Sequence, residues 1–419
     1  MARFAFLPTK SSRFAIAAAM MTVGTLGATA IATPAYAQKE PKFSKEFVAA
    51  FQEIDEAMKA ENPDYSALRP QVEAASDAVK TDDDRFVYGS TLYNIGGKLS
   101  DVALQRAGMD MMLASGKVPE ESVPQYTYVS GQLAFNTEDW PAARQRFEQA
   151  IELGYQPDEA RALIARTYTL EGNFTAALGA VNDQIDEAIA AGGKPDETLL
   201  KRGLTTAYNN ELYEDAANYS LLLVKYYPGP LMWGDAIAIQ RNVGQWSDAE
   251  VLDLLRLARA TGAMRDARDY ADYIDAANYR RLPSEVAAVV QEGVSSGKLQ
   301  PSDAFVAEAQ SEATSRTAGL KADLGSLERD AKASGASASL AVAAGDAYLN
   351  FDNGAKAAEL YELALTRPDV DRALALTRLG IAQVKMGDYV AAQETLSKVE
   401  GKRAPIAKLW VAYAEQQAG

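Results

Sequence analysis

The chain contains no cysteine and no histidine among its 419 residues. Without cysteine there is no disulfide framework, no thiol nucleophile and no lipid-modified N-terminal cysteine. Without either residue type, the commonest zinc ligands and the usual general base are also missing. These absences argue against most hydrolytic enzymes. We therefore expect a protein that is not an enzyme, with no catalytic residue, no metal site and no cofactor.

Positive charge is also scarce. The chain has 42 lysine and arginine residues against 57 aspartate and glutamate residues, for a formal net charge of −15. An acidic surface of this size repels nucleic acid and anionic lipid headgroups. Beyond the N-terminus there is no apolar run long enough to span a membrane. We expect no nucleic-acid partner and no membrane insertion of the mature chain.

Residues 1–37 have the features of a cleaved signal peptide. Three basic residues (Arg3, Lys10 and Arg13) precede an apolar run over residues 14–32, and Ala35-Tyr36-Ala37 matches an A-x-A cleavage site. Cleavage would leave Gln38 first and, by removing three positive charges, take the net charge from −15 to −18. The competing interpretation is a retained membrane anchor, since the run could span a bilayer. An exported, cysteine-free chain of this size favours a bacterial periplasm.

What the mature chain does contain is a helical repeat. Ala357 and Ala392 lie 35 positions apart, and Ala143 and Ala177 lie 34 apart. Apolar residues at three- and four-residue spacing fill the segments between turns, proline and acidic residues start these segments, and glycine ends them. A period of this length predicts stacked helical hairpins and an all-α fold.

The residues that recur are similar to those of tetratricopeptide repeats, which place small residues where helix A crosses helix B. This resemblance implies an all-α fold, a right-handed α-solenoid of TPR-like helix-turn-helix repeats. The last two units carry the frame as Gly345, Tyr348, Ala357 and Tyr361, and as Gly380, Ala392 and Leu396. Three upstream units carry the frame clearly: Gly131, Trp140, Ala143, Phe147 and Ala150 in the first, Tyr168, Ala177 and Val181 in the second, and Gly203, Tyr208, Tyr213, Ala216 and Leu223 in the third. Two further units carry it weakly, one through Trp246 and Ala249 and the other through Tyr279, Pro283, Ala287 and Gly293.

Five segments follow from these patterns. After the signal peptide (1–37), we expect an N-terminal helical region with a degenerate repeat (38–123) and a set of TPR-like repeats (124–312). A change to Ala, Ser and Gly predicts a non-repeat helix and hinge-like connection (313–337), with a continuous stack as the alternative. TPR-like repeats and a capping helix would complete the chain (338–419).

The resemblance also implies where a partner would bind. In tetratricopeptide repeats the concave groove is lined by helix A residues that face away from helix B. In this chain those are Gln125, Tyr128, Gln132 and Phe135 in one unit, Glu159, Arg166 and Thr169 in the next, and Lys201, Thr205 and Tyr208 in the third. Tyrosine and arginine are frequent binding hot spots.

An asparagine recurs four residues before an aromatic residue, in the pairs Asn136 and Trp140, Asn209 and Tyr213, and Asn242 and Trp246. One interpretation is helix C-capping, because asparagine tolerates the left-handed conformation. The other is a row of amides that hold the backbone of an extended peptide. A further cluster, Tyr270, Tyr273 and Tyr279 among arginines, is either an aromatic-basic patch or packing between irregular units.

Together these features predict a non-catalytic periplasmic scaffold that binds a protein or an extended peptide in its concave groove. One alternative is a scaffold subunit of an envelope export or polysaccharide-secretion apparatus, a use known for this family. An alternative from another class is a glycan-binding module or a carboxylate-based enzyme. Carboxylates converging in a deep pocket would favour the latter.

Overall fold

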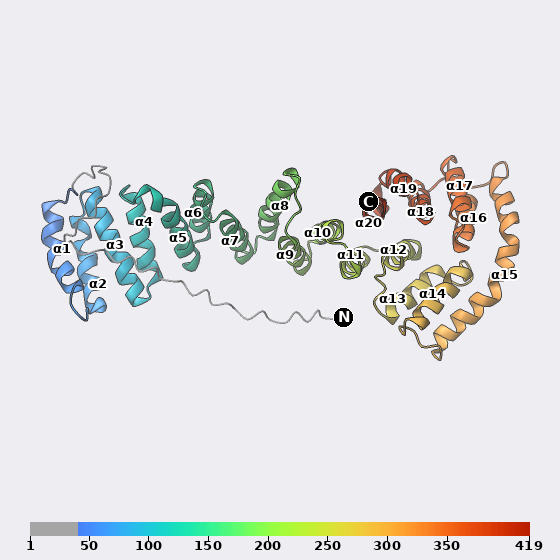
Figure 1. The fold of residues 1–419 in the computed structure, drawn as a ribbon, viewed down its shortest axis with the longest axis horizontal. Helices are drawn as coiled ribbons and strands as arrows, with labels where there is room; N and C mark the ends of the chain where they lie inside the picture. Colours follow the sequence, from blue (N-terminus) through green and yellow to red (C-terminus); the bar gives the residue numbers. More distant parts are fainter. Residues whose placement is uncertain (1–40) are drawn as a thin grey trace.

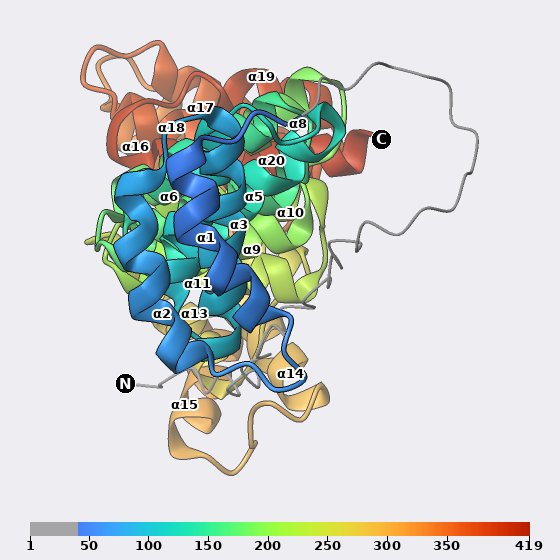
Figure 2. The same cartoon turned by 90° about the vertical axis from the view of Figure 1, so that its left-hand side faces the viewer.

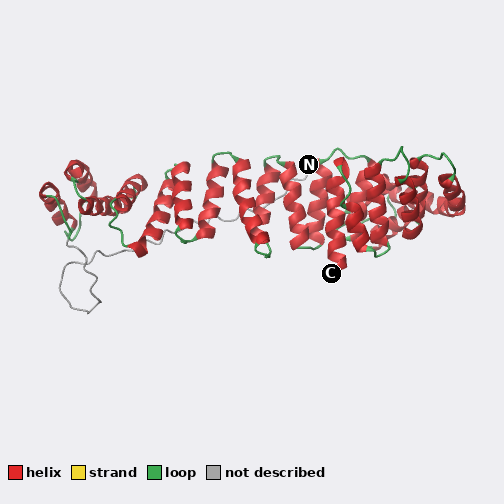
Figure 3. Cartoon of the chain, turned by 90° about the horizontal axis from the view of Figure 1, so that it is seen from above, coloured by secondary structure: helices red, strands yellow, loops and turns green. Residues whose placement is uncertain are grey.

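The computed structural model describes residues 41–419, so the predicted signal peptide and its cleavage site lie outside the described residues. Within this range the chain forms twenty α-helices, three short 3-10 turns and no strand. Consecutive helices pack side by side in antiparallel pairs along most of the chain. Seen from above, loops and turns lie along the two edges of the row of helices (Figure 3). The predicted all-α fold of stacked helix pairs is confirmed.

The first nine helices form an open row, which we call the arc (Figure 1). Viewed end-on, α1 and α2 lie in front of the rest of the stack (Figure 2). The helices of the arc are α1 (Lys45–Met58), α2 (Tyr65–Ala74), α3 (Asp82–Leu99), α4 (Val102–Ala114), α5 (Val123–Asn136), α6 (Trp140–Glu152), α7 (Pro157–Leu170), α8 (Phe174–Ala190) and α9 (Glu197–Asn209), with 3-10 turns at Ala75–Ala78 and Glu120–Ser122.

The remaining helices turn back on themselves, and we call them the ring. They are α10 (Tyr213–Tyr226), α11 (Pro230–Val243), α12 (Asp248–Ala260), α13 (Ala267–Ala277), α14 (Pro283–Ser295), α15 (Ala304–Lys332), α16 (Ala338–Asn350), α17 (Gly354–Leu365), α18 (Arg372–Lys385), α19 (Tyr389–Leu396) and α20 (Ala404–Ala418), with a 3-10 turn at Gly401–Arg403.

Most helices begin or end at proline, aspartate or glycine residues that favour a helix boundary. Six helices carry proline in their first turn, where its missing N–H is not needed. Asp139 caps α6 by accepting a hydrogen bond from the N–H of Ala142 at 3.2 Å. Gly154 follows α6 with a φ of +74°, a conformation that costs glycine little. Local chemistry therefore accounts for most of the helix starts and ends.

Helix pairs are held together where a glycine of the first helix meets a large side chain of the second. A Cβ atom at Gly131 would lie 2.8 Å from the ring of Phe147, and one at Gly203 would lie 2.4 Å from that of Tyr219. Gly345 faces Tyr361 in the same way, and Gly380 faces Leu396. The same number of residues separates the partners in all four pairs. The repeated frame inferred from the sequence is thus the contact between paired helices.

The C-terminal segment was expected to cap the end of a stack. It does form a helix, but α20 packs on α10, α12 and α18 as well as on α19, and so closes the ring. Trp233 and Leu257 belong to the same apolar core as Tyr361 and Trp410. The terminal helix is therefore packed between elements that are distant in sequence, with one side still exposed at Lys408.

The predicted non-repeat segment is part of a longer helix. α15 starts at Ala304 and runs without interruption to Lys332, so the boundary predicted between 312 and 313 falls inside it. Its first turns pack on α14, its last on α16, and most of residues 314–323 between them are exposed. The boundary predicted at 337/338 coincides with the start of α16. In the part of the chain described, none of the helices is both long and apolar enough to cross a bilayer.

Candidate protein-binding groove

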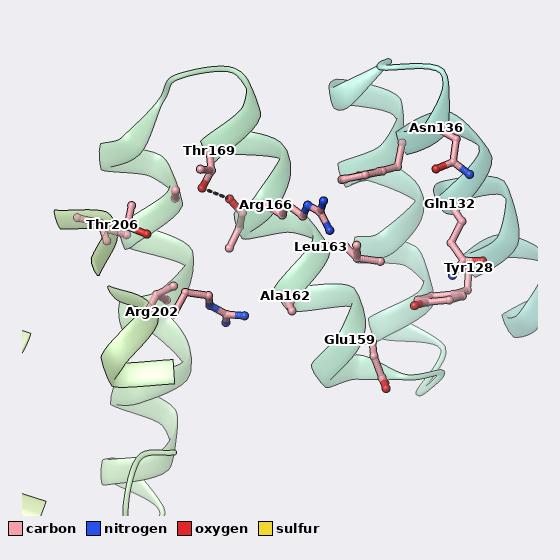
Figure 4. A pocket seen from close by; sticks show the side chains of 15 residues that line it. Tyr128, Gln132, Asn136, Glu159, Ala162, Leu163, Arg166, Thr169, Arg202 and Thr206 are labelled. Carbon is pink, nitrogen blue, oxygen red and sulfur yellow. Dashed lines mark hydrogen bonds between the residues drawn. The ribbon is translucent and has the colours of Figure 1, made fainter. Parts of the chain in front are cut away.

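The arc contains a groove of about 630 Å³ formed by four helices, with α7 at its centre and α5 and α9 on either side (Figure 4). Helix α8 completes the floor. The lining residues are Tyr128, Gln132, Phe135 and Asn136 of α5; Glu159, Ala162, Leu163, Ala165, Arg166 and Thr169 of α7; Ala177, Leu178 and Val181 of α8; and Arg202 and Thr206 of α9.

On α5 the lining residues follow helical spacing and so share one face. Tyr128 is buried, with its ring 5.6 Å from those of Phe147 and Tyr155, and only its edge reaches the groove. Burial raises the pKa of its hydroxyl, and the nearby charge of Glu159 adds to this. Phe135 is partly exposed and packs edge-on against Trp140 at 5.2 Å. Tyr128 thus forms part of the wall, whereas Phe135 offers a ring to a ligand.

On α7 the lining residues also fall on one face, with Glu159 at the start and Thr169 near the end (Figure 4). Arg166 lies over the ring of Phe135, with 5.5 Å between its guanidinium carbon and the ring centroid. Within residues 41–419, Arg166 and Arg202 have no carboxylate within 4.0 Å. Both side chains are exposed. The groove therefore presents two unneutralised positive charges in an acidic protein.

On α9 the lining residues are Arg202 and Thr206, whereas the expected groove residues were Lys201, Thr205 and Tyr208. A shift of one residue turns the face by about 100° around a helix. The groove lies between α5 and α9, so it contacts the side of α9 that faces back toward α7. Lys201 pairs with Glu197 of its own helix at 2.7 Å. Gln125, in the first turn of α5, also lies outside the lining.

The recurring asparagines end helices but do not cap them in the left-handed conformation. Asn136 and Asn209 are the last residues of α5 and α9, and the positive φ angles belong to Glu138 and Glu211 two positions later. The capping interpretation is wrong, because the residues in the left-handed conformation after these helices are Glu138 and Glu211 and not the asparagines. Asn136 lines the groove, whereas Asn209 and Asn242 do not.

Two of the three clustered tyrosines pack inside the ring. Tyr270 and Tyr273 are 4% and 1% exposed, so they form core contacts between irregular helices. Tyr279 is partly exposed, and the guanidinium carbon of Arg280 lies 5.8 Å from its ring centroid. The hydroxyl of Tyr273 donates to Glu285 at 2.7 Å, and both Nε and Nη2 of Arg256 donate to the same carboxylate at 2.7 Å.

A second buried ion cluster joins distant parts of the ring, and sequence reasoning missed it. Asp253 of α12 forms an ion pair with Arg378 in α18, with 2.9 Å between Nε and Oδ1, and accepts a hydrogen bond from Nη1 of Arg403 before α20 at 2.8 Å from Oδ2. Arg378 also donates to Asp346 at 2.8 Å, and Tyr361 donates to Asp346 at 2.7 Å. These carboxylates are paired with cations and lie in the core. Among the described residues no group of acidic side chains could hold a metal ion.

No protein-family model and no curated protein match the chain. Solved structures that are similar to the chain over most of its length include the following two. A structure of Naa15/Naa10 bound to HypK-THB is 13% identical, with 86% of this chain and 67% of that chain covered and a TM-score of 0.26. A crystal structure of the yeast Tom70 is 10% identical, with 89% and 96% covered and a TM-score of 0.22. At such TM-scores the chains do not superpose as wholes, so the fold described above rests on the helix packing within this chain.

Proposed function

We propose that this protein is a non-catalytic scaffold that binds a segment of a partner protein in the groove of the arc. One observation carries the proposal: a partly exposed aromatic ring on α5, two arginines without a carboxylate partner on α7 and α9, and an aliphatic floor on α7 and α8 line the same groove. Exposed apolar surface combined with unneutralised charge is typical of protein-binding surfaces.

The other class of function has less support. A glycan-binding module or a carboxylate-based enzyme needs converging carboxylates in a pocket, whereas Glu159 is the one carboxylate among the groove residues. Asp253, Asp346 and Glu285 are engaged by arginines in the ring core. They are therefore better suited to holding helices together than to acid–base chemistry.

The cellular setting is part of the proposal. The basic residues, apolar run and A-x-A motif of residues 1–37 support export to a bacterial periplasm. In that compartment the protein would act alone with its partner or as a scaffold subunit of an envelope export or polysaccharide-secretion apparatus. Sequencing the N-terminus of the mature protein tests this directly. We expect Gln38, whereas an intact Met1 in carbonate-washed membranes would contradict export with cleavage.

The binding proposal is tested by reversing the groove charges. Arg166→Glu with Arg202→Glu should reduce capture of the native partner from cells at least tenfold, because both guanidinium groups are exposed and unpaired. The control is a second double substitution, Gln145→Glu with Glu148→Arg, on exposed positions of α6 away from the groove. If the control variant lost the partner and the groove variant kept it, the proposed site would be wrong.

A further inference from the structure

The aliphatic floor of the groove limits which backbone conformation a bound peptide can have. Six of the lining residues (Ala162, Leu163, Ala165, Ala177, Leu178 and Val181) are aliphatic and lie on α7 and α8. The hydroxyl of Thr169 is already used, since it donates to the carbonyl of Ala165 at 3.1 Å (Figure 4). An extended peptide laid over this floor would bring backbone N–H and C=O groups against carbon. Such groups lose water without gaining a partner, at a cost of about 1–3 kcal/mol each.

The amide row that would compensate for this loss is absent from the groove. Of the three asparagines expected to hold an extended backbone, Asn136 lines the groove and Asn209 and Asn242 do not. A helix has no such need, because its backbone hydrogen bonds are internal and it presents only side chains. The floor thus suits a helix better than a strand.

The chain also shows how one of its helices docks across hairpins through side chains. Trp410 of α20 donates from Nε1 to the carbonyl of Asp253 at 3.1 Å, and Gln416 donates from Nε2 to that of Val224 at 2.7 Å. Between these contacts Ala412 and Ala414 are buried and Val411 and Tyr413 are partly buried, and α20 packs on α10, α12 and α18. Docking there uses an apolar stripe bordered by polar side chains.

The positive charge of the groove determines which residues should flank the apolar stripe of a ligand. Arg166 projects from α7, the helix that carries part of the aliphatic floor, and Arg202 projects from the neighbouring α9; neither has a carboxylate partner within residues 41–419. A ligand with carboxylates beside its apolar stripe would neutralise both. Resting on the function proposed above, we infer that the groove binds an amphipathic α-helix of a partner protein, with an aliphatic stripe flanked by glutamate or aspartate.

The test is selection from a displayed library of random 16-residue peptides against the full mature protein. Peptides retained by the native protein and lost with the Arg166→Glu, Arg202→Glu variant are sequenced. We expect aliphatic residues at positions i, i+3, i+4 and i+7 with acidic residues beside them. The enriched peptides should become helical on binding, as measured by circular dichroism, and bind the reversed variant at least tenfold more weakly.

Three outcomes would overturn the inference. If the selected peptides contain proline or alternate apolar and polar residues, and their binding depends on the two arginines, the ligand is extended. That result would support the groove as the binding site and contradict a helical ligand. Peptides that bind native and reversed proteins equally would remove both the inference and the proposed groove. The recovery of no peptide, while the native partner is still captured through the arginines, would also exclude a single helix as the ligand.

Discussion

At the scale of single residues, paired helices meet where a glycine of one helix faces a large side chain of the next. The Tyr219 ring facing Gly203 cannot easily move, because its hydroxyl donates to Asn182 at 2.7 Å and the side chain is 2% exposed. Two helices approach closely here only because one of them lacks a Cβ atom.

Gly203→Ala should therefore destabilise the pair α9–α10. The added Cβ atom would lie 2.4 Å from the Tyr219 ring, and overpacking of this kind costs about 1–3 kcal/mol. Hydrogen exchange of α9 and α10 amides measures the effect locally. Gly179→Ala in α8 is the control, because nothing lies within 4 Å of its Cβ position. That change should stabilise by about 0.5–1 kcal/mol, and equal effects at both sites would refute the packing argument.

A second residue-scale effect concerns Glu285. Burial raises the pKa of its carboxyl group, but the charge and hydrogen bonds of Arg256 outweigh burial, and the pKa falls to about 2 from the usual 4.5. A lowered pKa contributes stability that is complete above pH 4.5 and is lost as the pH falls through about 2. The contribution declines by up to about 1.4 kcal/mol per pH unit in this window.

Glu285→Gln should consequently be less stable than the native protein at pH 7, and the gap should narrow between pH 5 and pH 3. Denaturant unfolding at each pH measures it. Glu362→Gln removes the same charge from an exposed position of α17 and should show a constant, small difference. A gap for Glu285→Gln that does not change with pH would show that its carboxylate is not held by Arg256.

At the scale of helices, the behaviour of α20 distinguishes the ring from the arc. In the arc each helix contacts its sequence neighbours, so a change remains local. In the ring α20 contacts α10 and α12, and the ion pair of Arg403 with Asp253 spans 150 residues of sequence. Loss of α20 should affect helices that are far from it in sequence.

Trp410→Ala tests this dependence. The indole is 2% exposed and donates to the carbonyl of Asp253, so its removal should cost about 3–5 kcal/mol. We expect faster hydrogen exchange in α10 and α12 and no change in α3 and α4. Lys408→Ala on the exposed face of the same helix is the control. Faster exchange confined to α19 and α20 would mean that the helix is a simple terminal cap.

At this scale the sequence predicted what is local and missed what is distant. Proline, aspartate and glycine mark helix ends within a few residues, and the glycine frame pairs helices that follow one another. Arg378, Asp253 and Arg403 carry no such signal, because their contact depends on how far the chain curves over many repeats. For the same reason the sequence assigned Lys201 and Thr205 of α9 to the groove, whereas Arg202 and Thr206 line it.

At the scale of the whole molecule, the chain divides into an open arc and a closed ring (Figure 1). In the ring, α20 covers the surface formed by α10, α12 and α18, whereas the described helices leave the groove of the arc open. Seven of the thirteen residues expected to line the groove or hold a peptide meet in it: Tyr128, Gln132, Phe135, Asn136, Glu159, Arg166 and Thr169. The groove proposed to bind a partner thus lies in the N-terminal half, whereas the contacts that close the ring lie in the C-terminal half.

The most direct test of this account is site-specific photocrosslinking in living cells. A photoreactive amino acid is placed at Thr206 or Arg202 in the groove, or at Gln145 or Glu148 on the exposed side of α6. We predict one crosslinked partner from the groove positions, lost when Arg166→Glu is added, and none from α6. Crosslinks from α6 alone, or groove crosslinks that survive Arg166→Glu, would contradict binding in the groove of the arc.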